Sequence, residues 1–172
     1  MKRRRLLLLL FALIASGFPV PGPAAAQGTG QYSGLPLPRF ASLRSDRTHV
    51  RVGPTQKHDI KWTFARAGLP VEIVAEFETW RRIRDSEGAE GWVHQALLAG
   101  RRTALIAPAS KEATLPIYDR ARGERVMAQL QPGVLANVRQ CREGWCRISG
   151  ERFDGYIEQT RLWGVYPDET IE

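Results

Sequence analysis

Gly91-Trp92-Val93-His94-Gln95-Ala96-Leu97-Leu98-Ala99-Gly100 recurs 64 residues later as Gly155-Tyr156-Ile157-Glu158-Gln159-Thr160-Arg161-Leu162-Trp163-Gly164. The two stretches align without a gap. Upstream of them, the interval 68–80 recurs as 133–145, and each copy begins with glycine and ends with tryptophan. A repeat of this length predicts two copies of one structural unit.

Each unit consists of short segments with the alternation of β-strands. In the first unit, apolar and polar residues alternate over 49–52 and 71–77, and Gly53-Pro54 ends the earlier segment. Short strands in so small a unit cannot cover both faces of a flat sheet, which favours a small, partly closed β-barrel. The sequence therefore predicts an all-β protein. Its mature chain is divided into an extended linker and two barrels: residues 27–40, 41–107 and 108–172.

The N-terminal 26 residues have the organisation of a secretory signal peptide. Basic residues at 2–5 precede an unbroken apolar run at 6–14, and alanines occupy 24–26. The apolar run is too short to span a bilayer as a helix. We expect residues 1–26 to be removed, and a mature chain beginning near Gln27 to have no integral membrane segment and to be periplasmic or secreted.

Most of the positive charge belongs to this leader. The formal net charge of the 172-residue chain is +7, and it falls to +3 without residues 1–26. Residues 41–107 carry +3, whereas residues 108–172 carry −1. A nucleic-acid-binding protein shows a much stronger basic stripe, so no nucleic-acid partner is predicted.

Several motifs of the first unit resemble the bacterial SH3-like (SH3b) domain, in the subgroup of exported proteins with two such domains. They are Val50-Arg51-Val52-Gly53-Pro54, Trp80, Gly91-Trp92-Val93 and Leu97-Leu98, and the lead-in 34–40 is similar too. In the second unit, Pro116-Ile117-Tyr118-Asp119 stands where Arg51-Val52-Gly53-Pro54 would be, and Tyr156 replaces tryptophan. The resemblance implies two tandem SH3-like barrels that act as a binding or accessory module of the cell envelope.

Catalytic and metal-binding constellations are not evident in the sequence. Both cysteines lie in the second unit and all three histidines in the first, so a Cys/His pair would have to assemble between the units. The chain has no Gly-x-Ser-x-Gly, no His-Glu-x-x-His and no glycine-rich phosphate loop. Two cysteines without a nearby histidine do not make a zinc site. We predict a protein that binds rather than catalyses, without a cofactor or metal.

Cys141 and Cys146 are predicted to form a disulfide, because an exported protein with an even number of cysteines favours pairing. An even hairpin loop between them places the two cysteines opposite each other. At the aligned positions of the first unit, Glu76 and Arg81 could form a cross-strand ion pair. Ile73 and Ile83 share a face only if their hairpin loop has an odd number of residues, which conflicts with the even number that places the aligned cysteines opposite each other. A β-bulge would reconcile the two.

Aromatic and basic side chains are the candidate ligand contacts. Trp80 and Trp145 adjoin hairpin turns and either stack on a ligand or cover the hairpin. Trp92 either plugs the end of its barrel or contacts a ligand, and Tyr118 either lines a groove or packs. Arg82 and Arg84 share the strand face of Trp80 and either hold a carboxylate or are solvated.

The predicted partner is a peptide or glycopeptide of the cell wall, such as peptidoglycan, held mainly by the more basic first unit. The alternative is an envelope protein, for which the chain would serve as an interaction or scaffolding module in the periplasm. An aromatic-lined groove favours the first function, and a flat apolar patch or free sheet edge favours the second.

Overall fold

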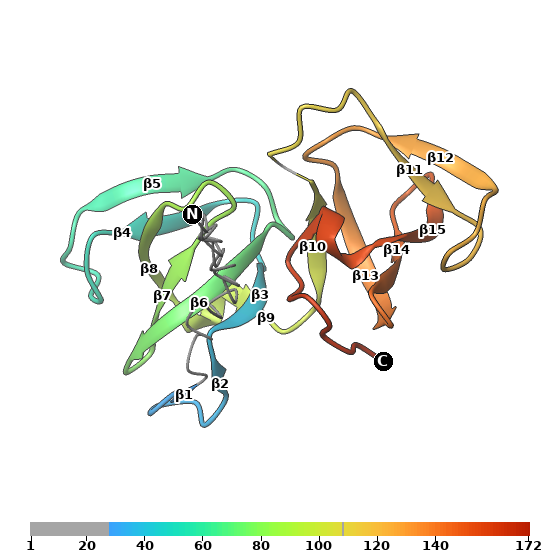
Figure 1. The fold of residues 1–172 in the computed structure, drawn as a ribbon. Coiled ribbons are helices and arrows are strands. Elements are labelled where there is room, and N and C mark those ends of the chain that lie inside the picture. The colour runs from blue at the N-terminus through green and yellow to red at the C-terminus, as the bar shows by residue number, and fades with distance from the viewer. Residues whose placement is uncertain (1–27, 108) are drawn as a thin grey trace, which may run out of the picture.

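The computed structural model describes residues 28–107 and 109–172, so the predicted signal peptide, 1–26, lies outside the described residues. These residues form two seven-stranded antiparallel sheets, which lie side by side in Figure 1, and one small two-stranded sheet. The first sheet contains β3 (Arg39–Leu43), β4 (Thr48–Arg51), β5 (Ile60–Phe64), β6 (Pro70–Phe77), β7 (Trp80–Arg84), β8 (Glu90–His94) and β9 (Leu98–Ala99). The second contains β10 (Thr103–Ile106), β11 (Leu115–Tyr118), β12 (Val126–Leu130), β13 (Leu135–Arg142), β14 (Trp145–Ser149), β15 (Asp154–Glu158) and β16 (Leu162–Trp163).

The two sheets have the same topology. Their strand orders are β5-β4-β8-β7-β6-β3-β9 and β12-β11-β15-β14-β13-β10-β16, so each strand has a counterpart in the other sheet. A 3₁₀ turn precedes the last strand of each, η1 (Gln95–Leu97) and η2 (Gln159–Arg161). The prediction of an all-β chain with two copies of one unit is confirmed. Both sheets are open, with β5 and β12 as the edge strands at one end and β9 and β16 as the edge strands at the other.

The repeated Gly-aromatic pair marks the tightest approach between strands. A Cβ at Gly91 would overlap the Val50 side chain, and one at Gly155 would lie 2.9 Å from the Tyr118 carbonyl oxygen. Glycine is therefore required where β8 approaches β4 and where β15 approaches β11. Each unit folds around its own core. Central members of these cores are Val50, Val71, Ile83 and Val93 in the first unit, and Ile117, Ile148, Ile157 and the two cysteines in the second.

The two central hairpins have the predicted register. Cys141 pairs with Cys146 across β13 and β14, and the two form a disulfide. Glu143 and Gly144 both have positive φ in the turn between them. The expected β-bulge is present, because the ladder of β6 and β7 shifts between Ile73 and Ala75.

The linker prediction is wrong in one respect, because residues 28–37 form a hairpin rather than an extended segment. Strand β1 (Gly28–Thr29) pairs with β2 (Pro36–Leu37), and the hairpin projects from the first unit in Figure 1. Its anchor is the carboxylate of Glu76, whose side chain is 1% exposed. This carboxylate accepts hydrogen bonds from Ser33 Oγ at 2.6 Å and Arg39 Nη2 at 2.8 Å. The predicted ion pair with Arg81 is present at 3.4 Å.

Side chains from both units meet in the contact between the sheets. Phe40 packs against the rings of Trp163 and Tyr166, with centroids 5.2 and 4.8 Å away. The Tyr166 hydroxyl donates to Glu72 at 2.8 Å, and Arg84 donates to the same carboxylate. Burial and this hydrogen bond raise the pKa of Tyr166, which keeps the phenol protonated as a donor.

Reduction of the disulfide is expected to lower the free energy of unfolding by about 2 kcal/mol, because the closed loop is short. Urea unfolding with and without a thiol reductant measures this difference. The Cys141→Ser/Cys146→Ser variant is the control, because reductant should not change its midpoint. An unchanged midpoint for the wild type after full reduction would contradict the prediction.

Acid is expected to destabilise the protein through Glu76. Burial raises the pKa of this carboxyl, but hydrogen bonds from Ser33 and Arg39 and the charge of Arg81 outweigh burial and lower the pKa from 4.5 to about 2. The folded state therefore binds its proton less readily than the unfolded state, and the stabilisation present above pH 4.5 is lost as the pH falls towards 2.

Replacing Glu76 by glutamine should remove this component, which amounts to about 2 kcal/mol between neutral pH and about pH 3. Urea unfolding at the two pH values measures it. Glu78→Gln is the matched control, because Glu78 is exposed and its side chain makes no ion pair among the described residues. An equal acid sensitivity of wild type and Glu76→Gln would refute the assignment.

Candidate functional site

The outer face of the first unit is closed at the position where a stacking ring was predicted. Trp80 is only 7% exposed, and its ring packs edge-on against His94 at 5.5 Å between centroids. His94 lies directly opposite Trp80 in the ladder of β7 and β8. The prediction that Trp80 supplies an open stacking face is therefore wrong.

The arginines beside it already have carboxylate partners. Arg82 forms an ion pair with Glu90 at 2.6 Å, and Arg84 donates through Nε to Glu72 at 2.9 Å. The hydrogen bond to Glu72 raises the pKa of Arg84. Because Glu72 also accepts from the second unit, Arg84 stabilises the contact between units rather than presenting a free charge for a ligand.

Two further tryptophans have locations that periodicity alone did not decide. Trp92 is half-buried and lies on the outer face, because its neighbours Gly91 and Val93 are buried on the inner face. In the ladders it is opposite Arg51 of β4 and Arg82 of β7. It does not plug the core. Trp163 packs against Phe40 of the other unit.

The equivalent face of the second unit is open. Trp145 occupies the position of Trp80, but the residue opposite it is Glu158 instead of histidine. Glu158 is exposed and its carboxylate lies 3.9 Å from Arg161, so no ring covers Trp145 from this strand. Glutamate in place of histidine opposite the tryptophan thus leaves the Trp145 indole half-buried and accessible.

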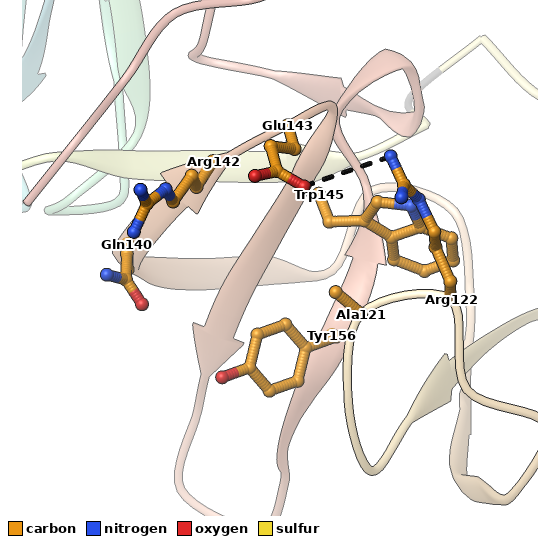
Figure 2. Close-up of a pocket in the computed structure, with 7 residues that line it drawn as sticks. All are labelled: Ala121, Arg122, Gln140, Arg142, Glu143, Trp145 and Tyr156. Carbon is orange, nitrogen blue, oxygen red and sulfur yellow. Dashed lines mark ion pairs between the residues drawn. The ribbon is translucent and has the colours of Figure 1, made fainter.

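A pocket of about 320 Å³ lies beside Trp145. Figure 2 shows Tyr156 and Trp145 at its apolar part and polar side chains around them. The lining comes from the loop after β11, from β13 and its turn, and from β14 and β15: Ala121, Arg122, Gln140, Arg142, Glu143, Trp145 and Tyr156.

Tyr118 contacts this site from the side. Its ring meets Trp145 edge-on at 5.9 Å, and it pairs with Tyr156 across β11 and β15. Tyr118 thus lies on a strand, at the position of Arg51, and not in the loop equivalent to Gly53-Pro54 as the sequence alignment implied. The structure brings together Trp145 and Tyr118 from the predicted set, and places Trp80, Arg82, Arg84 and Trp92 in the other unit.

The charges of the pocket are solvent-exposed. Arg122 lies 4.0 Å from Glu143, and both side chains are more than two-thirds exposed, so this pair contributes little stability and is easily separated. Arg142 and Gln140 are also exposed. The pocket therefore offers aromatic surface, guanidinium donors, an amide and one carboxylate within a small area. This set suits a ligand with both an apolar part and ionic groups.

Sequence reasoning missed Arg122, Gln140, Arg142 and Glu143. The available signal was the comparison of the two copies, in which Glu158 replaces His94 opposite the repeated tryptophan. Both cysteines of the chain are in the disulfide. No cluster of three or more His, Cys, Asp or Glu side chains suited to a metal ion occurs within residues 28–107 and 109–172.

Comparisons with known proteins place this fold in a family. Two solved structures, of NlpC1 and NlpC2 from Trichomonas vaginalis, are similar with 14% and 15% identity and TM-scores of 0.32 and 0.31. They cover 78% and 73% of this chain, which spans about half (48%) of each of them. No curated protein matches. No helix of the described residues is long and apolar enough to cross a membrane. The family model for the bacterial SH3 domain matches residues 44–100 and 111–164, and the chain therefore belongs to the bacterial SH3 domain family, with two copies of the domain.

Proposed function

We propose that the protein is a non-catalytic binding module of the cell envelope that recognises a peptide of the cell wall through its second domain. The observation that carries this proposal is the accessible Trp145 in a pocket with Tyr156, Arg122 and Arg142. Membership in the bacterial SH3 domain family supports a binding role. The proposal moves the predicted site from the first domain to the second.

The chemistry of the pocket fits such a peptide. An aromatic face packs against an aliphatic stem, and the guanidinium groups of Arg122 and Arg142 can pair with carboxylates. Glu143 can accept hydrogen bonds from an amine. Because the pocket is small and its charges are exposed, we expect affinities in the micromolar to millimolar range.

The disulfide supports a location outside the cytoplasm. Structural disulfides form and persist in oxidising compartments, and the Cys141–Cys146 pair is fully buried. Together with the predicted signal peptide, this supports a periplasmic or secreted protein that meets the wall directly.

A free sheet edge favours the alternative function, a protein-interaction module. Strand β12 forms one end of the second sheet, and its residues Val126 and Met127 are 46% and 50% exposed. An unpaired edge with apolar side chains can accept an extended strand from a partner protein.

Retention on purified peptidoglycan tests the wall-peptide function. Trp145→Ala should weaken retention about tenfold because the stacking surface is lost. Glu158→His copies the residue that covers Trp80 in the first domain, so it should also weaken retention while preserving the tryptophan.

Arg82→Glu is the matched control, since Arg82 lies on the same face of the first domain, and it should bind like the wild type. Thermal unfolding confirms that the variants are folded. Equal retention of wild type and both pocket variants, or a loss confined to Arg82→Glu, would exclude the pocket. No retention of the wild type at low salt would leave the protein-interaction function.

A further inference from the structure

A second and larger cavity lies mainly on the second domain, beside its contact with the first domain, which contributes Arg66. It has a volume of about 770 Å³ and shares no lining residue with the pocket at Trp145. Three arginines line it from different segments: Arg66 before β6, Arg101 between β9 and β10, and Arg152 between β14 and β15. We call this cavity the inter-domain groove.

Hydrogen bonds between the domains hold the base of this groove. Thr103 Oγ1 donates to the Gly68 carbonyl oxygen at 2.6 Å, which joins β10 to the loop before β6. Ser42 Oγ lies 2.6 Å from Thr103 Oγ1 and 2.6 Å from the Arg101 carbonyl oxygen. Ser42 and Thr103 are buried, so the groove is formed before a ligand arrives.

The Arg101 guanidinium group lies close to Gly68. A Cβ at residue 68 would lie 3.0 Å from Arg101 Nη2 and 3.3 Å from Leu135 Cδ2, and Gly68 also has a φ of +80°. Glycine at this position therefore gives the backbone its turn and leaves space for the guanidinium group.

The arginines of the groove differ from the arginine cluster of β7. Arg81, Arg82 and Arg84 each have a carboxylate partner. Among residues 28–107 and 109–172, the structure gives Arg66, Arg101 and Arg152 no ion pair and no side-chain hydrogen bond within the chain. The only carboxylate in the groove lining is Glu151, which leaves a net charge of +2 from three arginines and one glutamate.

We propose that the inter-domain groove binds an anionic ligand with two or more linked phosphate groups. Arginine pairs with phosphate through two parallel hydrogen bonds, and a terminal phosphate offers three acceptor oxygens and up to two charges to neighbouring guanidinium groups. The remaining lining is part polar and part apolar. Gln129, Asn137 and Thr114 can form hydrogen bonds to the ligand, and the apolar residues are Leu130, Val134, Leu135, Ala136 and Phe153. This site is independent of the wall-peptide pocket.

Calorimetric titration of the mature chain with tripolyphosphate tests the proposal. The Arg101→Glu/Arg152→Glu variant should bind at least about tenfold more weakly, and added salt should weaken wild-type binding because the charges are exposed. Arg152→Glu alone should weaken binding by about threefold. Because Arg152 lies on a turn away from the Ser42–Thr103 contact, this single variant tests the site even if the double variant does not fold.

Two controls separate this site from general charge and from the other pocket. Arg47→Glu makes the same change at an exposed arginine outside the groove and should leave affinity within about twofold. Trp145→Ala should bind tripolyphosphate like the wild type, even if it loses peptidoglycan. Absence of wild-type binding at low salt, or an equal loss in Arg47→Glu, would overturn the site. Triglutamate binding as tightly as tripolyphosphate would overturn the choice of phosphate.

Discussion

The close approach of two strands at a glycine is the constraint on which each domain depends. At Gly91 and Gly155 a side chain would collide with the neighbouring strand, so only glycine lets β8 and β15 lie against β4 and β11. This approach folds the sheet over a small core and fixes the next residue, Trp92 or Tyr156, on the outer face. The scaffold therefore presents an aromatic residue at the same place in both copies.

The two copies use this common scaffold differently. In the first domain His94 covers Trp80, and carboxylates neutralise the arginines of β7, so the outer face is filled. In the second, Glu158 replaces the histidine and Tyr118 replaces Arg51, which leaves an aromatic pocket with exposed charges. The difference between the two outer faces thus follows from a few cross-strand exchanges and not from the net charge of each domain.

Features set by neighbouring residues along the chain could be predicted from the sequence. The repeat follows from the self-similarity of the sequence, and the disulfide from the even number of cysteines and their hairpin spacing. The bulge near Ile73 and the Glu76–Arg81 pair follow from period-two alternation and hairpin register. The burial of the Trp80 ring could not be predicted this way, because it depends on His94 of the next strand. The hairpin at residues 28–37 was also missed, since the buried carboxylate that anchors it lies more than 40 residues away.

The contact between Phe40, Trp163 and Tyr166 has a consequence for modularity. Although one bacterial SH3 domain is the unit of the family, neither half of this chain could be moved intact to another protein. A first domain alone would expose Phe40 and leave the buried Glu72 without its phenol donor, and a second domain alone would expose Trp163. A mutation on one side of this contact therefore changes the environment of residues on the other side, so the two halves are coupled even though each half has its own core.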